Sequence, residues 1–219
     1  MRKIIIKNLS KSFKIGSVTR NILHDCNLEI GANETVGLLG LNGSGKTTLM
    51  KILAGVEELS GGKKIINGNI SWPVGIYSGL INNITVEQNI TLMAELLNIN
   101  PGRLLERVLV DANLSTSREN LVKNLSSGMK AKLGFVLATS IDFDFFIFDE
   151  LTAVGDKFFK ELFYKKIIEI KRDKTIIMTS HDNKMIEEYC DYAYIIDKQT
   201  ISKKYSINDA IEKYNMVTG

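Results

Sequence analysis

The sequence predicts an α/β protein in which helices pack on the faces of a parallel sheet, with a β-rich N-terminal part and a helical insertion. Three observations lead to this fold class. Strands and helices alternate along residues 143–196, which is typical of a parallel sheet. Thr35 to Leu39 is a continuous apolar run, the pattern of a strand buried on both faces. Residues 86–112, in contrast, have helical spacing and few strand signals.

The first half of the chain supplies the β-rich part and one helix. Ile4 to Ile6 is a short β-branched run, and Ile22 to Ile30 alternates loosely, so both segments are predicted as strands. Lys46 to Ala54 is predicted as a helix that ends at Gly55. Lys64 to Ile70 contains an Asn-Gly pair between short apolar segments, which predicts a β-hairpin.

The second half of the chain supplies the helical insertion, the remaining strands of the sheet and the helices between them. Pro101 and Gly102 separate the two helices of the insertion. The predicted elements are, in chain order, helices Val86–Leu97 and Arg103–Ala112, a strand Phe143–Phe148, a helix Lys157–Arg172, a strand Thr175–Thr179, a further helix, and a strand Tyr192–Ile196.

Composition excludes several classes of protein. With 219 residues the chain has room for one domain and a sizeable core, and its formal net charge of +3 is too small to indicate a nucleic acid partner. No apolar run is long enough to span a membrane, and the N-terminus lacks the features of a signal peptide. The two cysteines, Cys26 and Cys190, have no metal-site spacing and fit a reducing cytosol.

The strongest motif is the segment Gly40-Leu41-Asn42-Gly43-Ser44-Gly45-Lys46-Thr47, which matches GxxxxGK[ST] between a predicted strand and a predicted helix. Glycines let backbone N–H groups converge on phosphate oxygens, and the helix N-terminus adds partial positive charge. We expect Lys46 to contact the β- and γ-phosphates of ATP and Thr47 to ligate Mg²⁺. The nucleotide-binding residues predicted here are Gly40, Asn42, Gly43, Ser44, Gly45, Lys46, Thr47 and Thr48.

A second motif ends the predicted strand at residues 143–148, where Asp149 and Glu150 follow four apolar residues. Ligands of open α/β sheets lie at the carboxyl ends of the strands. Asp149 is therefore a candidate Mg²⁺ ligand, and Glu150 is a candidate general base that polarises the attacking water. Without the phosphate loop, the same residues would fit a solvated acidic turn.

A third motif, Leu125-Ser126-Ser127-Gly128-Met129, precedes a helix that runs through Ala138. Taken by itself, it fits an ordinary helix N-cap formed by Ser126 or Ser127. Together with the other two motifs it resembles the ATP-binding cassette (ABC) ATPases, whose signature is close to LSGGQ. Ser126 and Gly128 match that signature, whereas Ser127 and Met129 depart from it.

The resemblance covers nearly the whole chain and implies further site residues. It implies that Ser126, Ser127 and Gly128 complete the γ-phosphate site of an opposite subunit. It also implies that His181 is the switch histidine and that His181, Glu150 and Lys46 are the catalytic residues. Asp156 would belong to the loop that joins the two sites of a dimer. Phe13 is a candidate for stacking on adenine, although a core or edge aromatic fits nearly as well.

The segment Ser71–Leu80 lacks the glutamine that most ABC ATPases carry at the start of the insertion, because Gln88 and Gln199 are the only glutamines in the chain. This puts the usual coupling chemistry in doubt. The Ser-Trp-Pro segment, the segment Ile84–Ile90, the Ala-Val-Gly-Asp loop and the length are similar to the capsular polysaccharide export ATP-binding proteins. Those are compact cassettes, and the length leaves no room for a polymer-reading domain after about Ile196.

The resemblance implies a single nucleotide-binding domain over residues 1–219, with a P-loop NTPase core at 1–80 and 141–219 and a helical subdomain with the signature at about 81–140. The core would hold a parallel sheet and an N-terminal antiparallel β part. The implied function is ATP hydrolysis that drives capsular polysaccharide export across the inner membrane. The implied assembly is a homodimer at the cytoplasmic face, bound to separate permease subunits that alone contact the polymer.

Other functions stay open at this stage. An O-antigen or teichoic-acid exporter would share the chemistry and differ in substrate. A soluble ABC ATPase of DNA repair or translation would carry tandem cassettes or long coiled-coil insertions, which this sequence lacks. An unrelated P-loop GTPase or kinase is a further alternative; a GTPase would need an NKxD guanine motif, which is also missing.

Overall fold

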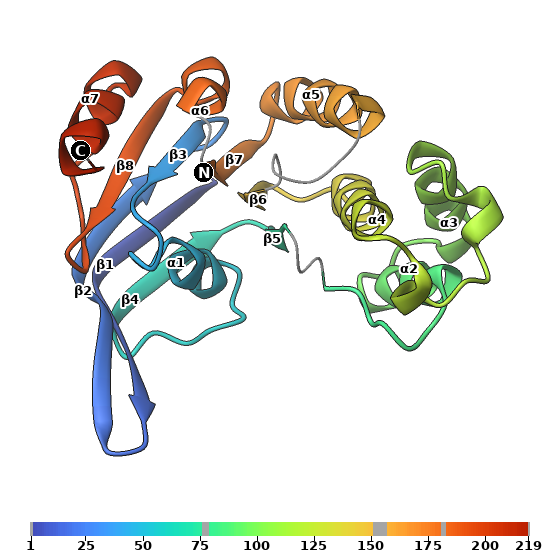
Figure 1. The fold of residues 1–219 in the computed structure, drawn as a ribbon, viewed down its shortest axis with the longest axis horizontal. Helices are drawn as coiled ribbons and strands as arrows, with labels where there is room; N and C mark the ends of the chain where they lie inside the picture. Colours follow the sequence, from blue (N-terminus) through green and yellow to red (C-terminus); the bar gives the residue numbers. More distant parts are fainter. Residues whose placement is uncertain (1, 76–78, 151–156, 181–182, 219) are drawn as a thin grey trace. The chain divides into compact units, whose positions relative to one another are not determined.

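The structure is a computed structural model that describes residues 2–75, 79–150, 157–180 and 183–218 (Figure 1). The chain divides into two compact units. The first consists of residues 1–73, 143–150 and 167–219, and the second of residues 74–142 and 151–166. The first unit holds the parallel strands and an antiparallel N-terminal sheet, so the predicted fold class is confirmed.

The N-terminal sheet of the first unit has three strands in the order β2-β1-β4, with bounds Val18–Ile30, Lys3–Ile15 and Gly61–Asn67. All pairs are antiparallel, and Ile4 lies opposite both Ile30 and Ile66. β1 and β2 are longer than the predicted strands at residues 4–6 and 22–30, and the far end of their hairpin extends beyond the rest of the sheet in Figure 1.

The second sheet of this unit has the strand order β5-β6-β7-β3-β8-β9. Its strands are β3 (Thr35–Leu39), β5 (Ile70–Val74), β6 (Phe145–Asp149), β7 (Thr175–Thr179), β8 (Tyr192–Asp197) and β9 (Thr200–Ile201). β3 pairs in parallel with both β7 and β8, and β6 pairs in parallel with β7. Every residue of β3 is buried, as its apolar run predicts.

The predicted hairpin at residues 64–70 is wrong. β4 pairs with β1, whereas β5 joins the second sheet beside β6, so the Asn67-Gly68 turn carries the chain from one sheet to the other. Gly68 has φ of 140°, and a Cβ there would lie 2.8 Å from both Asp144 and Phe145. The neighbouring N–H of Asn69 donates to the Asp144 carboxylate at 2.9 Å. The glycine therefore serves a tight crossing and not a two-strand turn.

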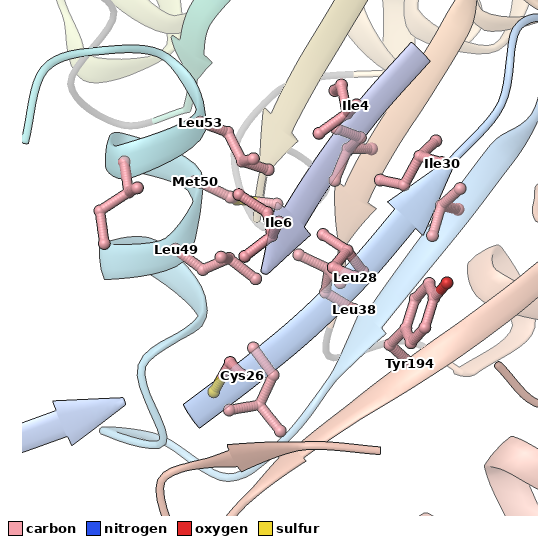
Figure 2. Close-up of a cluster of buried hydrophobic side chains, with 14 of the residues drawn as sticks. Ile4, Ile6, Cys26, Leu28, Ile30, Leu38, Leu49, Met50, Leu53 and Tyr194 are labelled. Carbon is pink, nitrogen blue, oxygen red and sulfur yellow. The ribbon is translucent and has the colours of Figure 1, made fainter. Parts of the chain in front are cut away.

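Three described helices lie wholly in the first unit, α1 (Lys46–Leu53), α6 (Asn183–Tyr189) and α7 (Ile207–Thr218), and the sequence analysis did not predict the last. The main core lies between the two sheets and α1. Figure 2 shows Leu49, Met50 and Leu53 of α1 directed toward Ile4 and Ile6 of β1. This packing fixes the start of α1, and with it the loop that precedes the helix.

The second unit is helical, and it contains the two helices that the sequence predicts for the insertion. Its helices are α2 (Val86–Leu96), α3 (Pro101–Asp111), two short 3₁₀ turns (Ser115–Ser117 and Val122–Asn124), α4 (Ser127–Thr139) and the start of α5 (Lys157–Lys171). Thr85 and Gln88 form a capping box on α2, and Asn100 caps α3. Phe135 of α4 packs against Phe159 and Phe163 of α5, with ring centroids 5.5 and 5.3 Å apart.

None of the helices in the described part of the chain has the length and apolar character needed to cross a membrane.

Candidate active site

The glycine-rich loop lies between β3 and α1, as predicted. A Cβ on Gly40 would lie 2.6 Å from the carbonyl oxygen of Ile196 and from Oγ of Ser44, so only glycine fits that position. Gly45, the N-cap residue of α1, has φ of 110°, a backbone conformation that side chains strongly disfavour. The loop conformation is therefore dictated by its glycines.

The N-terminus of α1 is open to a ligand. Among the described residues no side chain caps it, so its first backbone N–H groups keep their hydrogen-bonding capacity. A hollow of about 450 Å³ lies beside this helix end. It is lined by Arg20, Ile22, Asn42, Gly43, Gly45, Lys46, Thr47, Thr48 and Glu150, so the structure brings most of the predicted nucleotide residues together. Donors and partial positive charge at a helix N-terminus suit phosphate.

The Lys46 side chain folds over the loop. It is 7% exposed, and its Nζ donates to the carbonyl oxygens of Gly40 at 2.8 Å and Leu41 at 3.1 Å. Burial lowers the pKa of Lys46 below its ordinary value, while the carboxylates of Glu150 and Asp149 act in the opposite direction. The ammonium group thus lies within the field of both the predicted base, Glu150, and the predicted metal ligand, Asp149.

The two acidic residues lie at the carboxyl end of β6, where the sequence predicts them. Oγ1 of Thr47 donates to Oδ2 of Asp149 at 3.0 Å, which joins the phosphate loop to the acidic strand. Glu150 has φ of 55°, an uncommon conformation for a residue with a side chain. Such strained residues cluster at functional sites, where the surroundings hold them in place.

Thr179, the last residue of β7, is a site residue that the sequence analysis missed. Its Oγ1 donates to Oδ1 of Asp149 at 2.9 Å and accepts a hydrogen bond from the Glu150 N–H at 3.2 Å. The signal in the sequence is a hydroxyl residue at the end of a predicted strand. It indicates a site residue only if that strand lies next to the strand that ends in Asp149. The neighbour relation itself comes from the parallel pairing of β6 and β7.

Phe13 is not among the residues lining the hollow. It lies on β1 opposite Arg20 of β2, and Lys11 Nζ lies 4.5 Å from the centroid of its ring. Arg20 instead lines this hollow and a neighbouring one of about 550 Å³, which Ser44 and Asn42 also line. The stacking role of Phe13 therefore remains a prediction, and Arg20 is a second candidate contact that the sequence analysis missed.

The signature segment belongs to the second unit. Ser126 is the N-cap of α4, and its Oγ accepts a hydrogen bond from the N–H of Met129 at 3.2 Å. Ser126 and Ser127 are exposed. A Cβ added to Gly128 would meet no described atom within 4 Å. His181 and Asp156 lie outside the described residues, so the structure does not test them.

The region that matches a known protein family contains both the phosphate loop and β6 with the two acidic residues at its end. The family model described as "ABC transporter" matches residues 23–153, more than half of the chain. The chain belongs to the ABC transporter family. Its members' ATP-binding domains are ATPases, so the ATP hydrolysis that the sequence analysis expects is confirmed.

Curated relatives of this ABC ATPase extend the match to nearly the full length. The chain is 34% identical over 217 residues to the polysialic acid transport ATP-binding protein KpsT of Escherichia coli, covering 97% of this chain and 96% of the relative. It is 30% identical to the capsule polysaccharide export ATP-binding protein CtrD of Neisseria meningitidis, covering 97% and 98%. It is 37% identical to the teichoic acids export ATP-binding protein TagH of Lactococcus lactis, covering 84% of this chain and 41% of that relative.

The fold agrees with solved ABC cassettes. One is an ATP-binding cassette in a dimeric, post-hydrolysis state bound to ADP and Pi, with a TM-score of 0.82 at 18% identity, covering 93% of this chain and 98% of that chain. At this identity the likeness supports the fold.

Proposed function

We propose that this chain is the ATP-hydrolysing subunit of an exporter of capsular polysaccharide. The observation that carries the proposal is the end-to-end match to relatives named for polysialic acid transport and capsule export, over 97% of this chain. The residues of the candidate site support the ATPase part, because they surround one hollow beside an uncapped helix N-terminus.

The roles proposed for the residues of the first unit follow their geometry. The loop residues and Lys46 bind the phosphates of ATP. Glu150 accepts a proton from water as the water oxygen forms a bond to the γ-phosphorus, and the bond from that phosphorus to the β-phosphate oxygen breaks to release ADP. Lys46 is 7% exposed, and this burial strengthens the attraction between its ammonium group and the phosphate charge.

The donor set at Thr47 and Asp149 fits Mg²⁺. Magnesium in nucleotide sites takes oxygen ligands and is held by one or two protein groups plus water and phosphate. The hydroxyl of Thr47, which lines the hollow, and the carboxylate of Asp149 3.0 Å from it meet that need. We propose that these two residues hold the ion, which would neutralise phosphate charge when bound.

The signature residues Ser126, Ser127 and Gly128 are proposed to act on the ATP of a second copy of the chain. The space around Gly128 supports this role. Glycine in a helix is unfavourable by roughly 0.5–1 kcal/mol relative to alanine, and no described atom of this chain requires its small size. A close approach by another molecule would explain it. We further propose His181 and Asp156 as the switch histidine and the dimer loop, and the whole of residues 1–219 as one nucleotide-binding domain.

The remaining partners follow from the same proposal. The dimer would be a homodimer bound peripherally to separate permease subunits at the cytoplasmic face of the inner membrane. Closure would be favoured because ATP contacts both copies only in the closed state. Teichoic-acid export is the second candidate function, because the identity to the Lactococcus lactis relative reaches 37% within the matched region.

The test is deletion of the gene followed by analysis of surface and intracellular polymers. We expect capsule to disappear from the surface and lipid-linked polysaccharide to accumulate inside the cell. A plasmid copy of the wild-type gene should restore export, and a Lys46→Met copy should not. Normal surface capsule after deletion would end the proposal, and loss of teichoic acid with normal capsule would favour the second candidate.

A further inference from the structure

We propose that Thr179 is a positioning residue. It would hold the proposed magnesium ligand, Asp149, and the proposed base, Glu150, in the orientation that ATP hydrolysis requires. The inference rests on the proposed function, because it requires that Glu150 activates water for ATP hydrolysis. Thr179 itself lines no part of the hollow beside the phosphate loop, so it acts through the two acidic residues.

The position of Thr179 follows from strand pairing. β6 and β7 are parallel, and Asp149 and Thr179 are partners at the last step of their register. Thr179 is 3% exposed, so its hydroxyl depends on protein groups for its hydrogen bonds. A hydroxyl has one hydrogen to donate and lone pairs to accept, and here it does both. It donates to Oδ1 of Asp149 at 2.9 Å and accepts from the Glu150 N–H at 3.2 Å.

The bond to Glu150 matters because of the backbone at that residue. With φ of 55°, Glu150 is in the left-handed region, which persists only where the surroundings hold it. The Thr179 hydroxyl provides such a hold through the Glu150 N–H. Loss of the bond removes one restraint on this uncommon backbone conformation, and any change in the backbone moves the carboxylate with it. A displacement of about 1 Å at a reacting group is enough to slow catalysis on the order of a hundredfold.

The bond to Asp149 completes a chain of contacts across three elements. Oδ1 of Asp149 accepts from Thr179 of β7, and Oδ2 accepts from Thr47 of α1. Two hydroxyl donors, one on each oxygen, fix the plane of the carboxylate. Thr179 therefore connects the backbone of the proposed base to the proposed magnesium ligand, and through it to the phosphate loop.

The first experiment compares Thr179→Val, Thr179→Cys and Thr179→Ser in the full chain. Valine preserves the shape and removes both hydrogen bonds, cysteine weakens them, and serine keeps them. We expect kcat for ATP hydrolysis to fall roughly ten- to a hundredfold for valine, by an intermediate factor for cysteine, and by less than about threefold for serine. The Kd for a fluorescent ATP analogue should change little in all three, because the phosphate loop is untouched.

Thr175→Val is the matched control. Thr175 begins the same strand, is 1% exposed, and also makes two hydrogen bonds through its hydroxyl, to the Gly31 carbonyl and the Asn33 N–H. It lies at the end of β7 away from the acidic pair. If loss of any buried hydroxyl in β7 slowed hydrolysis through general loss of structure, Thr175→Val would slow it as well. We expect the kcat of this variant to remain near that of the wild type.

A second experiment asks whether Thr179 acts through Glu150. In a Glu150→Gln background the base is gone, so Thr179→Val should reduce the residual hydrolysis by a much smaller factor than in the wild type, because groups that act together are not additive. An equal factor in both backgrounds would overturn the proposal, and so would an unaffected kcat in Thr179→Val or no difference between the serine and valine variants. A wild-type chain that neither binds nor hydrolyses ATP would overturn the proposed function itself, together with this inference.

Discussion

Two glycine- and serine-rich segments of this chain each lead into a helix, and their surroundings differ. The phosphate loop, residues 40–47, leads into α1, and the signature segment, residues 125–129, leads into α4. A Cβ on Gly40 would collide with the chain's own atoms at 2.6 Å, whereas one on Gly128 would meet no described atom within 4 Å. The first loop is shaped by contacts inside its own unit, and the second leaves space.

The helix ends differ in the same way. Among the described residues, no side chain caps α1, while Ser126 caps α4. The donors of α1 are thus kept for a ligand, and those of α4 are partly satisfied by the chain itself. Under the proposed function, the open end of α1 would bind phosphate, and the capped start of α4 would face the nucleotide of a second copy. Three pairs of variants test the contrast, taken from the largest expected effect to the smallest.

The largest effect is expected for Lys46→Met. The substitution keeps most of the length of the side chain and removes the ammonium group of a residue that lines the hollow. Removing one preorganised donor from a site that stabilises developing charge typically lowers kcat on the order of a hundred- to a thousandfold. We expect a loss of at least that size in ATP hydrolysis, measured by phosphate release, together with weaker binding of a fluorescent ATP analogue.

Lys51→Met is the control for Lys46→Met. Lys51 lies in the last turn of the same helix and is exposed, so it tests loss of charge from α1 without a change in the hollow. Hydrolysis by Lys51→Met should stay within about twofold of the wild type, as surface changes usually do little. If Lys46→Met hydrolysed ATP as the wild type does, the phosphate site would not be at this loop.

A smaller effect on hydrolysis is expected for alanine at Gly128. Compared with alanine at Gly40, it should also differ in its effect on stability. At Gly128 alanine removes a helix-unfavourable glycine and meets no described atom, so stability should stay equal or rise by up to about 1 kcal/mol. Hydrolysis should nevertheless fall roughly tenfold or more, because the methyl group would enter space proposed for the nucleotide of a second copy. Thermal unfolding and ATPase assays at two protein concentrations measure both quantities.

At Gly40 the same substitution should damage the fold as well as the activity. Overpacking a filled site costs about 1–3 kcal/mol, and here the obstacles include a backbone carbonyl that does not yield easily. Gly40→Ala is therefore expected to be less stable and inactive, and Gly128→Ala stable and slow. A Gly128→Ala variant with normal hydrolysis would show that its open space has no role in the reaction.

How much of this could be predicted from the sequence differs between local and long-range features. Lys46–Leu53, Thr175–Thr179 and the two helices of the insertion follow from local periodicity, capping residues and burial, and the structure has them within one or two residues. The loop at Gly40 was recognisable because its motif is contiguous. These features depend on residues that are neighbours in the chain.

The features that the sequence analysis missed or predicted wrongly depend on which strands pair with each other. The Asn67-Gly68 pair looks like a hairpin turn, because the local sequence does not reveal that β4 and β5 belong to different sheets. Thr179 has no distinctive neighbours in sequence, and its importance appears only when β7 is placed beside β6 in register with Asp149. Phe13 and Arg20 lie opposite each other in a long hairpin, and no sequence pattern indicates which of the two lines the hollow.

The smallest loss of stability, and the sharpest separation of two roles, are expected at Ser126. The cap and the signature are both assigned to this residue, so substitution should separate them. Ser126→Ala removes the cap and is expected to lower the free energy of unfolding by about 1 kcal/mol. Ser126→Asp should keep the cap, because its carboxylate accepts from the Met129 N–H and suits a helix N-terminus. Thermal or denaturant unfolding of the two variants measures this part.

Hydrolysis should not follow stability in this pair. If Ser126 contacts the γ-phosphate of the ATP in a second copy, the negative charge of aspartate opposes that contact, and Ser126→Asp should hydrolyse ATP more slowly than the less stable Ser126→Ala. Binding of a fluorescent ATP analogue to dilute protein should be equal in both, since the phosphate loop of each copy is unchanged. If activity instead tracked stability across the wild type and the two variants, Ser126 would be only a helix cap. The contrast between the two loops would then rest on Gly128 alone.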